Sequence, residues 1–266
     1  MTFWNAVVGG LGLPAFGIAL FLAQEIVHEI GYRLGRRARP GDQQTEGIGV
    51  IVGAMLGLLG FVLALTLSFA SARFNERRDA TIAEANAIGT AWLRAQAISH
   101  PRGADIVGLV EEYAKARTAF ILAPAGDPAL EEISRRVSDL QTKLWAQVTT
   151  IVRERPDPVS ASLMVSMNDV FDMTAKERFA YAFPLPPQLI WLLLGMVLIA
   201  MAGLGYQLGR RGLLPRVMIS LLIATWTVVV MVIIDLGTAR TGAFRTSAAA
   251  YEATLASFRS SAAAVR

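Results

Sequence analysis

The feature that most constrains this chain is an apolar run at residues 48–70, which continues into charged sequence without a helix-breaking residue. The run is long enough to cross a bilayer, which takes about 20 apolar residues. From Ser71 to Arg94 there is no proline, and Gly89 is the one glycine. The sequence therefore predicts a membrane-crossing helix that extends several turns into water. This design is typical of proteins that lead ions or signals from a membrane into a helical domain.

The composition agrees with a membrane protein that also has a soluble part. Apolar residues make up 54% of the chain and the mean hydropathy is +0.46, both above a typical soluble domain. Charged residues, at 17%, are too many for a chain that lies entirely in lipid. Four stretches meet the spanning criterion, at 3–23, 48–69, 189–206 and 217–234. No Lys or Arg precedes Arg33, so a cleaved signal peptide is not expected.

Charged segments divide the chain into two membrane hairpins with a polar region between them. We expect an all-α, polytopic membrane protein with about four transmembrane helices and a helical extramembrane domain. The expected domains are a first hairpin at 1–72, a helical domain at 73–185, a second hairpin at 186–238 and a helical tail at 239–266. Within the helical domain, turns that contain proline separate helices at 105–122, 129–155 and 160–182, with Asp105 as the cap of the first.

Arginines in the two short loops bear on the orientation in the membrane. They are Arg33, Arg36, Arg37 and Arg39 in one loop, and Arg210, Arg211 and Arg216 in the other. By the positive-inside rule both loops lie in the cytoplasm, which places the helical domain outside. The arginines just beyond the second span argue for the opposite orientation, so the sidedness stays open.

Small residues recur on one face of the second span. They are Gly53, Gly57, Gly60, Ala64 and Ser68, spaced three or four residues apart. This spacing lets helix backbones approach closely in lipid, and ordinary helix packing is one interpretation. The other is that about five copies of this helix surround an axis. Phe61 and Leu65, one turn apart, would then form a hydrophobic constriction that gates ions by dewetting.

Three arginines, Arg73, Arg77 and Arg78, follow this span directly. In a ring of copies they would concentrate anions at one mouth of a pore. The alternative is a solvated helix face at the headgroup boundary. Further along, Glu84 lies on an otherwise apolar surface, and we expect it to make a buried hydrogen bond to a neighbouring helix, with Arg94 or Arg73 as its partner.

Ionisable residues near the first span form a second cluster. Glu25, His28 and Glu29 are spaced to share one helix face, at the end of the predicted span. Their position close to the interface favours snorkelling to the membrane surface, or pairing with Arg33, over a functional role.

No signature of catalysis, cofactor binding or metal binding is present in the sequence. There is no HExxH, GxSxG or P-loop pattern, so we do not expect an enzyme. Cysteine is absent, which excludes disulfides, thiolate metal sites and cysteine nucleophiles. The pI of about 9.7 reflects arginine-rich flanks of membrane helices, and no nucleic-acid-binding module is present.

Several segments resemble a bacterial family described as bestrophin-like, a domain of unknown function with distant kinship to bestrophin channels. The specific segment is GLLGFVLALTLSFASARFNERRDATIAEANAIGTAWLRA. The stretches GYRLGRRAR, LMVSMNDVFDMTAKERFAYAFPLPP and IID fit the same family. The resemblance implies a homopentamer with an ion pathway on its axis and a neck lined by the second helix.

Which residues of this chain correspond to the neck depends on the residue used to align it with those channels. Anchoring on Arg73 places Gly57, Phe61 and Leu65 at the neck, whereas anchoring on Gly60 and Phe61 shifts the ring by one turn. Gly57 stands where those channels have a bulky neck residue. No dense acidic run matches the calcium clasp of the animal proteins, so calcium gating is not implied.

Together these observations predict a passive ion channel of bestrophin type in a bacterial inner membrane. Its partners would be membrane lipid and further copies of itself in a cyclic homo-oligomer, with no cofactor. The transported ion, chloride or a monovalent cation, is not determined by the sequence. The alternative is a non-conducting, membrane-anchored helical sensor or scaffold.

Overall fold

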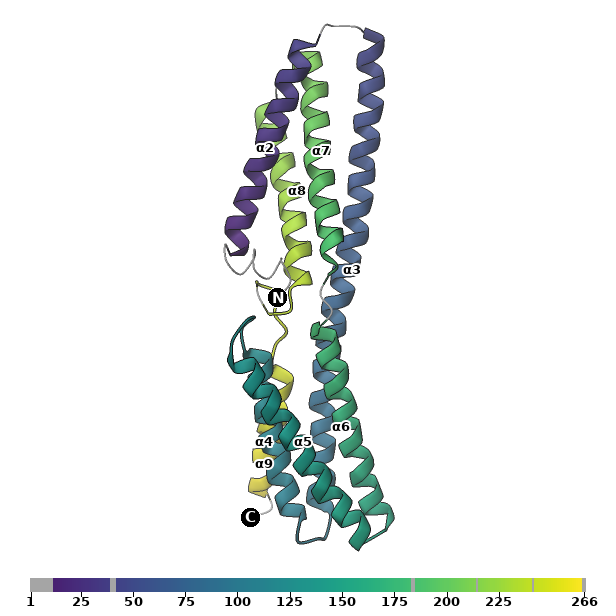
Figure 1. Ribbon diagram of the computed structural model, residues 1–266, viewed down its shortest axis with the longest axis vertical. Coiled ribbons are helices and arrows are strands. Elements are labelled where there is room, and N and C mark those ends of the chain that lie inside the picture. The colour runs from purple at the N-terminus through teal and green to yellow at the C-terminus, as the bar shows by residue number, and fades with distance from the viewer. Residues whose placement is uncertain (1–11, 39–41, 183–184, 214, 241, 265–266) are drawn as a thin grey trace. The chain divides into compact units, whose positions relative to one another are not determined.

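The computed structural model describes residues 12–38, 42–182, 185–213, 215–240 and 242–264 (Figure 1). Its helices are α2 (Leu13–Arg37), α3 (Asp42–Ala97), α4 (Gly103–Leu122), α5 (Ala129–Glu154), α6 (Pro158–Ala182), α7 (Pro187–Arg211), α8 (Arg216–Gly237) and α9 (Ala249–Ala264). No strand occurs within these ranges, and four helical segments are long and apolar enough to cross a membrane. The chain is therefore an all-α polytopic membrane protein, as the sequence predicted.

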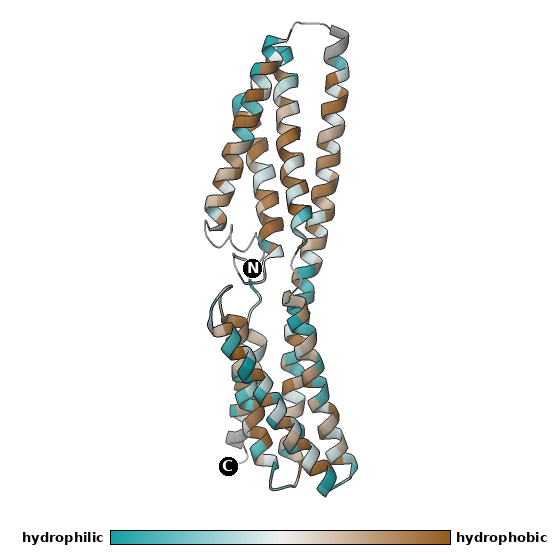
Figure 2. Ribbon diagram, in the orientation of Figure 1, coloured by the Kyte–Doolittle hydropathy of each residue, from teal (hydrophilic) through white to brown (hydrophobic). Residues whose placement is uncertain are grey.

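The chain divides into two compact units, which are described separately. Unit 1 comprises Met1–Arg73, Leu185–Thr238 and Gly242–Phe244, and unit 2 comprises Phe74–Pro184, Ala239–Thr241 and Arg245–Arg266. Unit 1 therefore contains α2, α7, α8 and the first part of α3, whereas unit 2 contains the rest of α3 with α4, α5, α6 and α9. Apolar residues dominate much of α7, α8 and the first part of α3, whereas they alternate with polar residues along the helices of unit 2 (Figure 2).

Helix α3 is one uninterrupted helix of 56 residues. This confirms the prediction that the apolar run continues as a helix into the charged sequence. The segment after the run is rich in alanine and arginine, which have high helix propensity, and it lacks proline.

The first span lies further along the chain than predicted. Helix α2 begins at Leu13 and ends at Arg37, whereas the predicted span was 3–23, of which residues 3–11 lie outside the described ranges. Arg33 and Arg36, expected in a loop, therefore lie in the C-terminal turns of α2. Cations are favourable there, because they face the negative end of the helix dipole.

The prediction of this span was wrong because it treated the first polar residues as the end of the membrane segment. Gln24 is fully buried, and its Nε2 donates a hydrogen bond to Thr227 Oγ1 of α8 at 2.8 Å. His28 is also buried. These polar groups face other helices, so they do not interrupt the helix.

Helices α2 and α7 pack with their backbones in direct contact. A Cβ atom added at any of four glycines would overlap a backbone carbonyl oxygen of the other helix. The overlaps pair Gly31 with Ala202, Gly35 with Tyr206, Gly205 with His28 and Gly209 with Tyr32. The partners advance together by four residues, so the two helices run parallel. Glycine is required at these positions because any side chain would separate the helices.

These glycines belong to a short internal repeat. Helix α2 ends in GYRLGRR and α7 ends in GYQLGRR, and each helix has 25 residues with a proline in its first turn. The repeat places a glycine pair with GxxxG spacing on both helices, which is a signal for close packing. The contact between α2 and α7 was not predicted, because small-residue spacing was considered only for the second span.

Unit 2 has a hydrophobic core of its own. Along α5, the buried residues Val137, Leu140, Leu144, Val148 and Ile151 are three or four positions apart and form one stripe. The rings of Trp92 on α3 and Phe258 on α9 are stacked with centroids 4.6 Å apart. Helices α4, α5 and α6 confirm the helices predicted in this region to within two residues, except that Asp105 lies in the first turn of α4 and does not cap it.

Candidate functional site

The residues predicted to form a constriction lie on an exposed face of α3. Phe61 is 61% exposed and Leu65 is 55% exposed in the single chain. Gly57 is exposed too, and a Cβ added there would meet no atom within 4 Å. Ala64 and Ser68 share this face. The face is therefore apolar, contains several small residues, and is available to a partner.

The opposite side of α3 packs within unit 1. Its buried residues are Val52, Leu59, Leu63, Thr66 and Ala70. Among the small residues predicted for helix packing, Gly60 approaches α8, because a Cβ there would lie 3.7 Å from the Trp226 ring. Gly53, Ala64 and Ser68 are exposed instead. Within one chain, these three residues therefore do not make the helix packing that was predicted for them.

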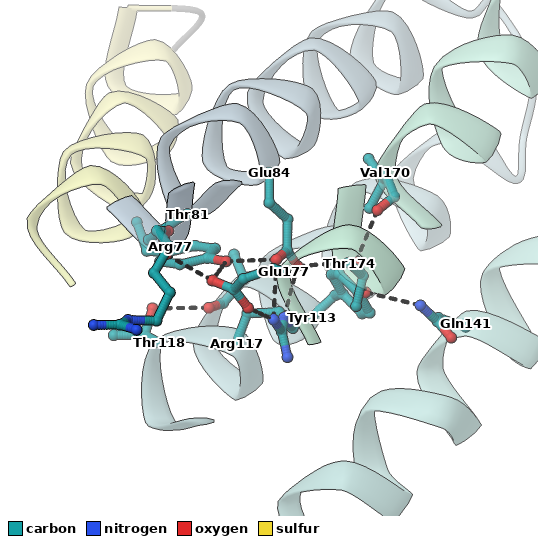
Figure 3. A network of polar contacts seen from close by, with 12 residues as sticks. Arg77, Thr81, Glu84, Tyr113, Arg117, Thr118, Gln141, Val170, Thr174 and Glu177 are labelled. Atoms are coloured by element: carbon teal, nitrogen blue, oxygen red, sulfur yellow. Dashed lines mark hydrogen bonds and ion pairs between the residues drawn. The ribbon is translucent and has the colours of Figure 1, made fainter. Parts of the chain in front are cut away.

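The three arginines after the span have different environments. Arg73 is half-buried, and its guanidinium lies 5.2 Å from the centre of the Phe69 ring. Arg78 is exposed. Arg77 is only 1% exposed and lies inside unit 2, beside the polar cluster described next (Figure 3). In the single chain, Arg73 and Arg78 therefore reach solvent, as residues at a pore mouth must, whereas Arg77 does not.

A buried ionic cluster joins four helices of unit 2 (Figure 3). We call it the Glu84 cluster, and its members are Thr81, Glu84, Tyr113, Arg117, Thr174, Glu177 and Tyr251. Arg117 of α4 donates to both carboxylate oxygens of Glu84, from Nε at 2.6 Å and from Nη2 at 2.9 Å, and it also pairs with Glu177 of α6. All three side chains are at most 1% exposed.

Hydroxyl groups complete the cluster. Tyr251 of α9 donates to Glu84 Oε2 at 2.7 Å, and Thr174 donates to Glu84 Oε1 at 2.9 Å. Thr81 Oγ1 donates a hydrogen bond to Glu177 Oε1 at 2.8 Å. Each carboxylate oxygen therefore has a partner, which is what buried charges require.

The cluster shifts the pKa of its tyrosines and its arginine. Burial, and then the negative charge of Glu84, raise the pKa of Tyr113 to about 12. The same two causes raise the pKa of Tyr251 well above its usual value. Burial is the largest single effect on Arg117 and lowers its pKa, but Glu84, Tyr251 and Tyr113 together outweigh burial and raise that pKa. The tyrosines are thus hydrogen-bond donors at neutral pH, and the arginine is a permanent cation.

Glu84 has a buried partner, as predicted, but neither of the two arginines predicted for that role fills it. Arg94 donates instead to the carbonyl oxygen of Ser162 at 2.8 Å, and the partner of Glu84 is Arg117 on another helix. Arg73 belongs to unit 1. A buried glutamate on a helix predicts some cation, but nothing local identifies an arginine 33 positions away.

The ionisable residues of α2 line a pocket in unit 1 that also has an apolar wall. The pocket has a volume of about 520 Å³, and Glu25, His28 and Arg33 are among its lining residues. Arg33 Nε donates to Glu29 Oε1 at 2.7 Å, which confirms the predicted pairing. In the described part of the chain, no three His, Cys, Asp or Glu residues are placed to hold a metal ion.

Comparison with solved structures shows what fold these units have. A bestrophin homologue from Klebsiella pneumoniae matches with a TM-score of 0.59 at 14% identity, over 92% of this chain and 97% of the homologue. Two single-residue variants of a bestrophin homologue from the same organism match with TM-scores of 0.61 and 0.64, at 15% and 14% identity. Each of these covers 92% of this chain, and 97% and 96% of the respective variant.

A further structure, described as a membrane protein, matches with a TM-score of 0.60 at 15% identity, over 93% of this chain and 97% of its own. No protein-family model and no curated protein matches the sequence. At this level of identity the comparison establishes the shared fold. The chain therefore has the fold of a bacterial bestrophin homologue.

Proposed function

We propose that this chain forms a homo-oligomeric, bestrophin-type channel that conducts ions passively across a bacterial inner membrane. Copies of α3 would surround a central axis. The family resemblance suggests five copies. The observation that carries the proposal is the exposed face of α3 with Gly57, Phe61 and Leu65. The fold shared with bestrophin homologues supports it.

The small residues on this face favour a helix partner over lipid. A face that contacts only lipid gains nothing from glycine, whereas Gly53, Gly57, Ala64 and Ser68 allow close approach of a neighbouring backbone. Between such contacts, Phe61 would project toward the axis and narrow the pathway. Arg73 and Arg78 would then lie near one mouth and attract anions. The transported ion is chloride or a monovalent cation, and no cofactor is part of the proposal.

The first test is the size of the particle in detergent, followed by ion flux from liposomes. In detergent we expect a cyclic oligomer. In liposomes, the flux of chloride is compared with the flux of potassium. Phe61→Ala and Leu65→Ala should each change the flux severalfold, because each removes part of the constriction. Leu192→Ala is the matched control, since Leu192 is similarly exposed (51%) but lies on α7.

A monomer, or an oligomer with α3 facing lipid, would exclude the axial pore. An assembled particle that passes no ion would leave the non-conducting sensor or scaffold as the better description. Equal effects of Leu65→Ala and Leu192→Ala would show that the α3 face has no special role in conduction.

A further inference from the structure

A pocket in unit 2 lies between α3 and the start of α9. Its volume is about 370 Å³. Phe74, Arg78 and Thr81 line it from α3, and Arg245, Thr246 and Ser247 line it from the segment that leads into α9. We call it the α3–α9 pocket. Of its lining residues, Arg78 is the one that the proposed pore mouth also uses.

The charge in this pocket has one sign. Two of its nine lining residues, Arg78 and Arg245, carry guanidinium groups, and none carries a carboxylate. Glu252, in the first turn of α9, is exposed and does not line the pocket. An anion would therefore meet two cations and no lining carboxylate.

Helix α9 adds its N-terminus to the same pocket. Ala249 and Ala250, its first two residues, are lining residues. The first backbone N–H groups of a helix have no partner within the helix, and the helix dipole makes this end positive. Ser247 Oγ accepts the N–H of Ala249 at 3.1 Å, which leaves the hydroxyl hydrogen of Ser247 free to donate. Helix N-termini with hydroxyls and cations are a common binding arrangement for phosphate groups.

Thr246 supplies the independent indication of a ligand. Its side chain is only 9% exposed, and its Oγ1 has no hydrogen-bond partner within the described chain. Burying a hydroxyl without a partner is unfavourable, because its hydrogen bonds to water are lost and not replaced. A ligand that accepts a hydrogen bond from Thr246 would remove this penalty.

We propose that the α3–α9 pocket binds a phosphoryl group, held by Arg78, Arg245, Thr246 and the N-terminus of α9. Several donors converge from different directions, which suits a tetrahedral anion with several acceptor oxygens better than a halide. Phe74, Ile82 and Ala250 provide an apolar wall for an organic part of the ligand. The phosphoryl group belongs either to a soluble phosphate compound or to a lipid headgroup.

The test uses the full-length protein, purified in detergent without phosphate. Inorganic phosphate and glycerol 3-phosphate are titrated by calorimetry at constant ionic strength, with chloride as the comparison anion. Phosphatidic acid in nanodiscs, against phosphatidylcholine, distinguishes a lipid source. We expect one saturable site per chain for at least one phosphoryl probe, and no comparable site for chloride.

Variants then locate the site. Arg245→Gln should weaken binding of the phosphoryl probe at least tenfold, and Thr246→Val severalfold, because valine keeps the shape of threonine without its hydroxyl. Arg135→Gln, an exposed arginine on α5, is the control and should bind as the unmodified protein does. Thermal unfolding without phosphate verifies that each variant is folded. If Arg245→Gln does not fold, Thr246→Val alone tests the site.

Two results would overturn the proposal. One is the absence of saturable binding for all three phosphoryl probes, or binding of chloride with equal strength. The other is undiminished binding in Thr246→Val and in a folded Arg245→Gln. Binding is measured without ion flux, so its outcome does not depend on the channel proposal.

Discussion

In unit 1, the parallel helices α2 and α7 meet through Gly31, Gly35, Gly205 and Gly209, with no side chain between their backbones. In unit 2, the junction of α3, α4, α6 and α9 contains a buried arginine between two buried glutamates. Both junctions are buried and depend on specific residues at specific positions. They use opposite kinds of residue.

The difference follows from the solvent around each kind of helix. Lipid is as apolar as a leucine side chain, so spanning helices gain little by burying apolar surface and depend on close contact instead. A helical domain in water is stabilised by apolar burial, which is favourable in many registers. A polar cluster such as that of Glu84 is satisfied in only one of them, and we infer that it fixes the arrangement of the four helices.

The strongest test of this comparison is Arg117→Met. The substitution removes the cation and leaves Glu84 and Glu177 buried together, which should lower the free energy of unfolding by about 4 kcal/mol. Thermal unfolding of the purified protein in detergent measures the effect. Arg136→Met is the matched control, because Arg136 pairs with Glu112 at 3.8 Å on the surface and should contribute under about 1 kcal/mol.

If the two arginine variants unfold at the same temperature, the cluster does not stabilise unit 2. A triple variant, with Arg117→Met, Glu84→Gln and Glu177→Gln, refines the result. It should recover part of the lost stability, because it leaves no uncompensated buried charge.

In unit 1, the corresponding test is the smallest substitution possible. Gly205→Ala adds a Cβ that overlaps the carbonyl oxygen of His28, so α2 and α7 must separate. We expect a loss of about 2 kcal/mol, in the range measured for overpacked sites. Gly195→Ala, on the same helix, adds a Cβ in open space and should be neutral or slightly stabilising.

A clearly lower unfolding temperature for Gly205→Ala than for Gly195→Ala would support backbone contact as the link between α2 and α7. Equal effects would show that the helices tolerate separation. Unit 1 would then be held by its side chains, and the contrast with unit 2 would disappear.

The sequence predicted those parts of the fold that depend on local chemistry. The bounds of α5 follow from Pro128 before it and Pro156 after it, and its apolar stripe repeats at helical spacing. The continuity of α3 follows from the absence of a breaker over a long stretch. Such features are properties of a segment, and no tertiary information is needed to find them.

The remaining features depend on residues that are far apart in the chain. Arg117 and Glu177 are 60 positions apart, and a nearby arginine was the natural but wrong partner for Glu84. The bounds of α2 were missed because Gln24 and His28 count as polar in the sequence, yet are buried against other helices. The assignments of Gly57, Phe61 and Leu65 to a neck stay predictions, because a pore needs several copies of the chain.

The smallest effect expected from the comparison is a dependence on alkaline pH that arises from unit 2. Burial and the charge of Glu84 raise the pKa of Tyr113 from 10.0 in the unfolded chain to about 12. Because the folded-state pKa is the higher one, the stability is fully present below pH 10 and is lost as the pH rises toward 12. At pH 11 this loss is about 1 kcal/mol for Tyr113.

Unfolding temperatures measured between pH 8 and pH 11.5 test this loss. The unmodified protein should lose stability above pH 10, and Tyr113→Phe should reduce that slope, because phenylalanine has no proton to release. Tyr251→Phe should act in the same direction, since the pKa of Tyr251 is also raised. The glycine contacts between α2 and α7 are made with backbone atoms, which do not titrate, so Gly205→Ala should lower the curve without changing its slope. A slope that stays the same in both phenylalanine variants would place the alkaline sensitivity outside the Glu84 cluster.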